Sequence, residues 1–297
     1  MLSEAQEHSE WVAPASPGWH KGATNSCRQL GWHPKVMIKT KNPLLKSPLE
    51  NPRLWITIGW LDVVQSYRRS FLGPMWITLN MAIFSVAMTL VYGAIFGIPT
   101  KEYSAYIITG MIGWIWVSSM LVEVGNTFIN YGAYIKNTVI DKAQMIWAMA
   151  FKQVIVLAHN LIIYGVAVAL GLIHVDLYSL LFLPNAAIFF MLSIPLTGLA
   201  AIAFSRYRDL PRLVGSVMVI VMLLTPVFWS PSMIKGWRQA VYHLNPIFYC
   251  IEFLRRPLLG LPPDPLITSV FLVMTVILWT YGTWFCHRYL RYVSFWV

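Results

Sequence analysis

The side chains that could take part in acid or base chemistry are few and scattered. Four of them stand within or beside long apolar runs: Glu123, Asp141, His159 and Asp209. A carboxylate or an imidazole in such a place could serve an intramembrane enzyme as a general acid or base. Polar groups at depth also join helices by hydrogen bonds, and we favour this interpretation for His159 and its neighbour Asn160.

The short motifs of other chemistries are absent from the sequence. There is no G-x-x-x-x-G-K-[ST] phosphate loop, no H-E-x-x-H zinc motif and no G-x-S-x-G nucleophile motif. The spacing of Cys27, Cys250 and Cys286 indicates neither a metal site nor a disulfide framework. We therefore expect no catalytic group, metal or cofactor in this chain. Energy for uphill transport would have to come from another chain.

The composition excludes most classes of soluble protein. Of the 297 residues, 11% are charged and 57% are apolar, against about 25% and about 45–50% in soluble domains. So few charges cannot cover the surface of a water-soluble globule of this size. The net charge of +10 does not indicate a nucleic-acid partner, because the basic residues lie beside apolar runs, as in membrane proteins.

Stretches without Lys, Arg, Asp or Glu predict the membrane spans. A helix needs about 20 mostly apolar residues to cross a bilayer, and in uninterrupted runs only a helix satisfies its own backbone groups. Six windows qualify, namely 70–100, 103–122, 153–175, 177–205, 213–234 and 265–287. We predict an all-α integral membrane protein in which residues 70–297 form a domain of six transmembrane helices.

The distribution of Lys and Arg predicts the orientation. Seventeen of the 22 lie before span 1, between spans 2 and 3, between spans 4 and 5, or after span 6. The positive-inside rule then places both termini in the cytoplasm. Residues 1–52 are polar and contain no signal-peptide pattern, so we interpret them as a cytoplasmic tail.

Residues 53–69 predict an amphipathic helix that lies on the membrane surface. Basic residues accompany Trp and an apolar stripe recurs at helical spacing, as in interfacial helices. The apolar stripe is Ile56, Trp60, Val63, Val64 and Tyr67, and the polar stripe is Asp62, Gln65, Ser66 and Arg69. Gly73-Pro74 should separate this helix from span 1. The alternative is that residues 53–69 simply begin span 1.

The segment between spans 5 and 6 contains helix breakers and short apolar pieces. Pro226 should kink or end span 5. Residues 231–263 then hold two apolar pieces, 233–244 and 246–259, that are too short to cross. They predict two short re-entrant helices on the outer side, which need protein or a water cavity around them. An outer loop resting on the membrane is an equal alternative.

Seven short motifs follow one another along the chain. They are YRRSFLGPMW (67–76), YIKN (134–137), AHNLIIY (158–164), SRYRDLPRLVGS (205–216), LLTPVFWSP (223–231), LNPIFY (244–249) and RRPLLG (255–260). Together, over residues 50–297, they resemble the permease subunit of bacterial ABC exporters for cell-surface polysaccharides, chiefly the O-antigen type with its capsule and teichoic-acid relatives. One departure is Val139-Ile140-Asp141, where the family has Leu-Pro.

The resemblance implies a homodimer in the bacterial inner membrane, joined by two copies of a separate P-loop ATPase that binds ATP and Mg. The cargo would be a lipid-linked polysaccharide, most simply an O-antigen. The ATPase-coupling residues would be Arg68, Arg69, Tyr134, Lys136, Asn137, Arg206, Arg208 and Asp209. Channel-lining residues on spans 1 and 5 would be Trp76, Phe84, Tyr92, Phe228 and Trp229. For Phe84 and Tyr92, which lie within span 1, core packing is the simpler explanation.

Three other functions remain open at this point. The chain could be the permease of a drug or small-lipid exporter of the same superfamily. It could be an intramembrane transferase acting on lipid-linked sugars, with its acid or base among the four residues named first. It could also be a passive pore, which would work without ATP.

Overall fold

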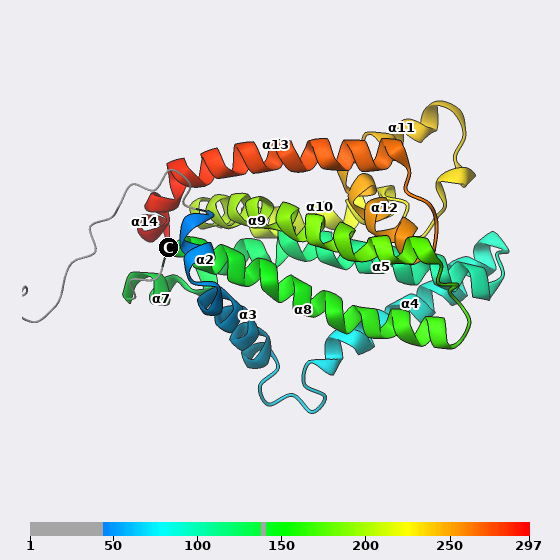
Figure 1. Ribbon diagram of the computed structural model, residues 1–297, viewed down its shortest axis with the longest axis horizontal. Coiled ribbons are helices and arrows are strands. Elements are labelled where there is room, and N and C mark those ends of the chain that lie inside the picture. Colours follow the sequence, from blue (N-terminus) through cyan, green and yellow to red (C-terminus); the bar gives the residue numbers. More distant parts are fainter. Residues whose placement is uncertain (1–43, 138–140) are drawn as a thin grey trace, which may run out of the picture. The chain divides into compact units, whose positions relative to one another are not determined.

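The computed structural model describes residues 44–137 and 141–297, which belong to the larger unit of the chain, residues 42–297. Every regular element in these residues is a helix, as predicted. Figure 1 shows α5, α8, α9 and α13 running side by side along the bundle. Most of the predicted cytoplasmic tail, residues 1–43, lies outside the described residues.

Five helices in the described part are long and apolar enough to cross a membrane. They are α4 (Met75–Phe96), α5 (Thr100–Val122), α8 (Lys142–Ala169), α9 (Phe182–Arg206) and α13 (Pro265–Tyr289). Four of them, all but α8, match a predicted window to within five residues at each end. The match follows because a helix in hydrocarbon tolerates few charges.

The helix α8 begins eleven residues before the window predicted for span 3. Asp141 is its N-cap, and the carboxylate accepts a hydrogen bond of 3.1 Å from the backbone N–H of Ala143. The predicted window begins only after Lys152, because the rule places every charged residue outside a span. Lys152 instead lies inside the helix, where two carboxylates pair with it.

The fifth predicted span differs most from the structure. Its helix, α10 (Leu210–Leu224), has 15 residues, which is about 22 Å of helix against about 30 Å of hydrocarbon. The helix ends where Pro226 was predicted to end it, since proline has no backbone N–H to donate. Residues 225–234 of the window are therefore not part of α10. Of the six predicted spans, this is the one whose helix is too short to cross the hydrocarbon by itself.

Shorter helices fill the connections. At the end of the bundle predicted to be cytoplasmic are α2 (Lys46–Glu50), α3 (Pro52–Ser66), η1 (Val124–Asn126), α6 (Thr127–Asn130), α7 (Gly132–Asn137), η5 (Leu290–Tyr292) and α14 (Val293–Trp296). At the other end are η2 (Leu177–Leu181), η3 (Pro231–Met233), η4 (Gly236–Gln239), α11 (Ala240–His243) and α12 (Pro246–Leu258). Of the two short helices predicted in 231–263, α12 is mostly buried against α5, α9 and α13, whereas α11 has only four residues. Their depth in a membrane stays a prediction.

The predicted surface helix 53–69 is observed as α3, and it packs on α8. The Trp55 ring lies 5.4 Å from those of Trp147 and Phe151, measured between ring centroids. Gly59 and Val63 are buried on the same face. This face of α3 therefore serves as a packing surface for the bundle.

The two predicted stripes of this helix are corrected by the structure. Val63 from the apolar stripe is buried, while Ile56, Trp60 and Val64 are exposed. Asp62 from the polar stripe turns toward α8, because Lys152 offers it a charge partner there. The exposed apolar residues are those available to a membrane surface, and that placement stays a prediction.

Gly59 allows the close approach of α3 to α8, which leads to a first prediction. A Cβ at this position would lie 2.5 Å from the Ala148 carbonyl oxygen, a backbone atom that cannot easily move. Gly59→Ala should therefore destabilise the protein by about 2 kcal/mol, although alanine favours helix by about 1 kcal/mol. Gly215→Ala on α10 is the control, since nothing lies within 4 Å of that Cβ. Thermal unfolding in detergent measures both, and equal effects would contradict the packing argument.

Candidate functional site

A cluster of charged side chains joins α3 to two long helices. Lys152 Nζ on α8 lies 2.7 Å from Asp62 Oδ2 on α3 and 2.5 Å from Glu123 Oε1 at the end of α5. The hydroxyl of Tyr131, which follows α6, donates a hydrogen bond to Asp62 Oδ1. We call these four residues the Lys152 cluster. It connects segments that lie far apart in the sequence.

Burial distinguishes this cluster from a surface ion pair. The exposed fractions of the side chains are 12% for Lys152, 15% for Asp62 and 51% for Glu123. The pair with Asp62 is thus largely withdrawn from water, whereas the pair with Glu123 is partly screened. Burial, and then the negative charge of Glu123, raise the pKa of the nearby Tyr67 hydroxyl.

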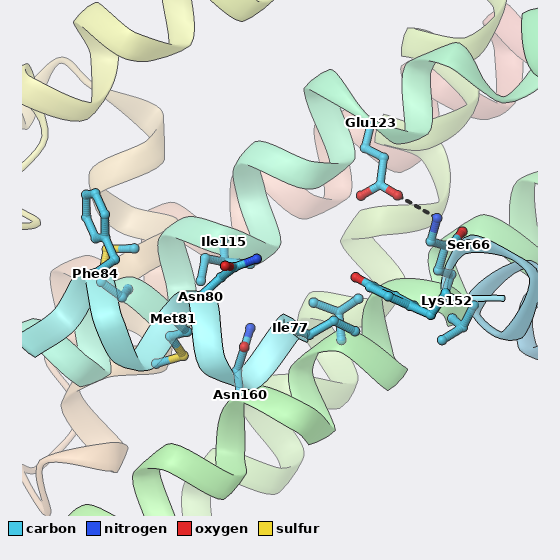
Figure 2. A pocket seen from close by; sticks show the side chains of 13 residues that line it. Ser66, Ile77, Asn80, Met81, Phe84, Ile115, Glu123, Lys152 and Asn160 are labelled. Atoms are coloured by element: carbon cyan, nitrogen blue, oxygen red, sulfur yellow. Dashed lines mark hydrogen bonds and ion pairs between the residues drawn. The ribbon is translucent and has the colours of Figure 1, made fainter. Parts of the chain in front are cut away.

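A cavity of about 350 Å³ opens beside the cluster, between α3, α4, α5 and α8. Figure 2 shows Glu123 and Lys152 toward one end and Phe84 toward the other. The walls between them are mostly apolar, with the amides of Asn80 and Asn160 among them. Its lining is Val63, Ser66, Tyr67, Ile77, Asn80, Met81, Phe84, Met111, Ile115, Glu123, Lys152, Val156 and Asn160.

Three of the five predicted channel aromatics meet. The Phe228 ring stacks on Tyr92 at 5.7 Å and 12°, and lies 6.0 Å from Phe84. Trp229 is held elsewhere, against Tyr242, and its indole N–H donates to the Leu223 carbonyl at 3.0 Å.

The fifth predicted aromatic lies apart from this group. Trp76 is exposed at the start of α4. The structure therefore places an aromatic group between α4 and the segment after α10, and whether this group lines a channel stays a prediction.

A second polar group lies buried at the far end of the bundle. The guanidinium of Arg255 on α12 donates from Nη1 to the Tyr106 hydroxyl at 2.7 Å, to Glu252 Oε1 at 2.6 Å and to the Pro226 carbonyl at 2.8 Å. It also lies 4.0 Å from the Tyr106 ring centroid, a cation–π contact. We call Tyr106, Glu252, Arg255 and the carbonyl of Pro226 the Arg255 clamp.

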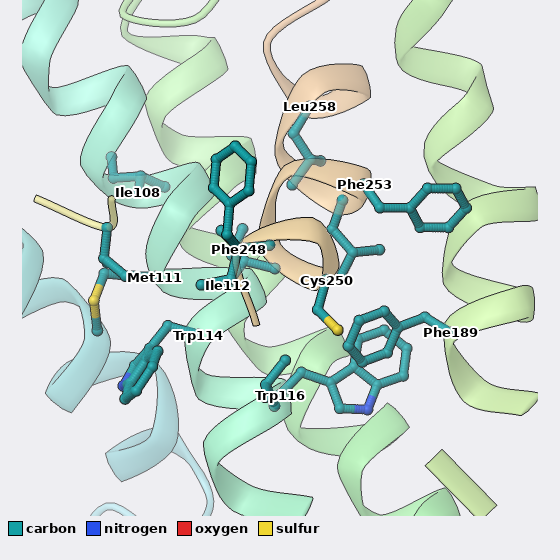
Figure 3. Packing of buried hydrophobic residues seen from close by; sticks show 14 of the residues in the cluster. Ile108, Met111, Ile112, Trp114, Trp116, Phe189, Phe248, Cys250, Phe253 and Leu258 are labelled. Atoms are coloured by element: carbon teal, nitrogen blue, oxygen red, sulfur yellow. The ribbon is translucent and has the colours of Figure 1, made fainter. Parts of the chain in front are cut away.

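The clamp fixes the chain where α10 ends. The one hydroxyl hydrogen of Tyr106 is shared between two carbonyls that follow the end of α10, those of Pro226 and Trp229, at 3.0 and 2.9 Å. Tyr103 donates to the carbonyl of Phe228. The freed carbonyls after Pro226 thus find donors on α5 and α12. Figure 3 shows α12 residues such as Phe248 and Cys250 packed beside α5 residues such as Ile112.

Comparison with known proteins identifies the family. Residues 53–259 match the family model for the ABC-2 type transporter, a range that includes the Lys152 cluster and the Arg255 clamp. The chain belongs to the ABC-2 type transporter family. This finding confirms the resemblance to ABC export permeases.

Three relatives of this ABC-2 chain have the same description. Two are O-antigen export system permease proteins RfbA of Klebsiella pneumoniae, 20% and 23% identical over 65% of this chain and 75% of each relative. The third is the O-antigen export system permease protein RfbA of Myxococcus xanthus, 23% identical over 79% of this chain and 92% of the relative.

The predicted coupling residues of the ABC-2 chain fall in three places. Arg68 and Arg69 are exposed in the turn after α3, and Arg69 has a left-handed φ of 70°. Lys136 on α7 donates to the Val297 carbonyl at 3.0 Å. The side chains of Tyr134 and Asn137, also on α7, lie outside the described residues.

The third place is the turn between α9 and α10. Arg206, Arg208 and Asp209 are exposed there. The Arg206 guanidinium lies 5.7 Å from the ring centroid of Trp296, which belongs to α14. The helix α14 also packs against both α9 and α7. Among the described residues, no ion pair joins Asp209 to either arginine.

The four acid or base candidates do not form one catalytic group in the ABC-2 chain. Asp141 caps α8, and Asp209 is exposed in the α9–α10 turn. Glu123 pairs with Lys152. His159 Nδ1 lies 2.9 Å from the Ile155 carbonyl of its own helix. In the part of the chain that the structure describes, no group of His, Cys, Asp and Glu could hold a metal ion.

The interhelical bond predicted for His159 and Asn160 takes another form. The Thr78 hydroxyl on α4 donates to the backbone carbonyl of His159 at 3.1 Å, so the imidazole is not involved. Sequence reasoning also missed the Arg255 clamp, since Arg255 was counted only as a charge on the outer side. The spacing of Glu252 and Arg255, which puts both on one helix face, was the available signal.

Proposed function

We propose that this ABC-2 chain is the channel-forming permease subunit of an exporter that passes a lipid-linked polysaccharide outward across the bacterial inner membrane. The observation that carries the proposal is its similarity to O-antigen export system permease proteins of two organisms. The proposed cargo is a polymer of the O-antigen class. Both termini would lie in the cytoplasm, as the Lys and Arg distribution predicts.

In the proposed assembly, two copies of this chain bind two copies of a separate ATPase, which holds ATP and Mg. Motion of the ATPase would reach the chain through α3 and α7. The Lys152 cluster supports this proposal, because it links α3 directly to α5 and α8. A push on α3 would then move two bundle helices together, which is the coupling between distinct sites that a transporter needs.

The aromatic group of Phe84, Tyr92 and Phe228 supports the choice of cargo. Flat aromatic faces suit the apolar faces of sugar rings, and Tyr92 and Phe228 are already stacked with 12° between their planes. Phe228 lies four residues after the end of α10, in the segment whose backbone the Arg255 clamp holds. Sugars passing along α4 would meet these rings.

Removal of residues 53–69 tests the function. The expected result is loss of surface polysaccharide, with the polymer retained inside the cell, because the ATPase would no longer act on the bundle. Surface staining and extraction of intracellular polymer measure this, and membrane fractionation checks insertion of the shortened chain. A matched strain carrying Lys101→Met should export normally, since Lys101 is exposed on the opposite end. Unaltered surface polymer in the deletion strain would reject the proposal.

A further inference from the structure

The cavity beside the Lys152 cluster extends into the bundle. Lys152 and Asn160 both line it and stand eight residues apart on α8, which is about 12 Å along a helix. Phe84, from the aromatic group, lines it as well. The cavity therefore runs from a charged entrance toward the aromatic group, within a single copy of the chain.

Asn160 is the unusual residue in this cavity. Its exposed fraction is 1%, and its Oδ1 has no hydrogen-bond partner among the described residues. A buried amide left unpaired costs about 1–3 kcal/mol. In Figure 2 the Asn160 side chain points from α8 toward Ile77 and Met81 on α4. The amide oxygen is therefore free to accept a hydrogen bond from an occupant of the cavity.

Charge limits what that occupant can be. The ammonium of Lys152 is already shared between Asp62 and Glu123. The three charges together leave one net negative charge at the entrance, which disfavours phosphate and other anions. The remaining polar groups that line the cavity, such as Asn80, Asn160 and Tyr67, are neutral and suit hydroxyl groups.

The volume and the walls of the cavity also limit what can occupy it. A volume of about 350 Å³ falls in the range of small-molecule sites. Ile77, Met81, Met111 and Ile115 form apolar walls, and Phe84 adds an aromatic one. A sugar ring combines an apolar face with hydroxyl groups at its edge, and this combination matches the lining.

We propose that this cavity binds an uncharged, hydroxyl-rich ring, a sugar unit carried by a membrane amphiphile. Asn160 and Asn80 accept hydrogen bonds from its hydroxyls, and Phe84 contacts its apolar face. The identity of the natural amphiphile rests on the proposed function, in which it is part of the exported glycolipid. Binding itself requires neither ATP nor a partner.

The probe is an alkyl β-glucoside with a diazirine on the first carbons of its chain. The full-length chain is placed in phosphatidylcholine nanodiscs, irradiated with the probe and analysed by mass spectrometry. We expect labels on α4 and α8 residues of the cavity, displaced by unlabelled glucoside and not by an alkyl phosphate of equal chain length. Asn160→Leu should weaken binding at least tenfold, about 1.4 kcal/mol.

Two further variants make the result decisive. Thr197→Val is the control, because Thr197 is also buried with an unpartnered hydroxyl in the described part but does not line this cavity; its labelling should equal the wild type. Asn80→Leu, at an exposed position, should also reduce labelling and covers the case in which Asn160→Leu fails to fold. The proposal would be overturned if the cavity residues were not labelled, or if an alkyl phosphate displaced the probe. It would also be overturned if Asn160→Leu and Asn80→Leu were both labelled as strongly as the wild type. Since no export is measured, failure of the exporter proposal would leave this test unaffected.

Discussion

Replacing Lys152 with methionine is expected to lower the free energy of unfolding by about 3 kcal/mol. The substitution leaves the Asp62 and Glu123 carboxylates without the ammonium that now lies between them. Breaking a buried ion pair costs about 3–5 kcal/mol, and the exposure of Glu123 places the expected value at the lower end. Unfolding in mixed detergent micelles measures the change.

A double-mutant cycle separates the two pairs. Asp62→Asn should lose most of its effect once Lys152→Met is present, with a coupling of about 2 kcal/mol. Glu123→Gln should couple to Lys152 by less than about 1 kcal/mol, because its carboxylate is partly in water. Additive effects at Asp62 and Lys152 would show that their contact contributes no stability.

Controls define what the Lys152 result means. Lys152→Arg keeps a positive charge and should retain most of the stability. Lys101→Met removes an exposed lysine and should change stability by no more than about 0.5 kcal/mol. Under the proposed function, Lys152→Met should also uncouple α3 from the bundle and reduce export, whereas Lys152→Arg should support it.

The sequence predicted the long helices well because hydrocarbon excludes charge. The windows for α4, α5, α9 and α13 were bounded by charged residues that lie close to the helix ends. The same rule failed for α8, because Lys152 lies inside that helix with its charge paired. The window rule treats every charged side chain as unpaired. Whether a charged side chain has an ion-pair partner depends on helices that are distant in the sequence.

The site was harder to predict for the same reason. Asp62, Glu123 and Lys152 belong to three separate segments and meet only because α3 and the end of α5 pack near α8. The resemblance named Phe84 on span 1 and Phe228 on span 5 as channel candidates, and their rings lie 6.0 Å apart, but a role in a channel stays a prediction. Trp76 shows the limit of that reasoning, because it is exposed at the other end of α4.

Replacing Arg255 with methionine should have the largest effect on stability, about 4 kcal/mol. Arg255 has an exposed fraction of 1% and bonds Tyr106, Glu252 and the Pro226 carbonyl. Its loss leaves a buried carboxylate and a buried carbonyl without this donor. Unfolding in mixed micelles gives the free energy, and hydrogen exchange should rise over residues 225–231, which the clamp now holds.

The neighbouring arginine is a matched control. Arg256 is partly exposed and lies 3.9 Å from Asp264, so Arg256→Met should cost less than about 1 kcal/mol. Arg255→Lys should be intermediate, since an ammonium lacks the planar fork that reaches several acceptors. If Arg255→Met and Arg256→Met were equally stable, the clamp would have no role in holding the segment after α10.

A variant at Glu252 shows whether the loss of stability in Arg255→Met comes from lost hydrogen bonds or from a buried carboxylate without a partner. In Arg255→Met, Glu252 is left as a buried negative charge, and adding Glu252→Gln removes that charge. The double variant should recover more than about 1 kcal/mol relative to Arg255→Met, because an unpaired buried charge costs more than an unpaired amide. No recovery would mean that the carbonyls after Pro226, and not Glu252, depend most on Arg255.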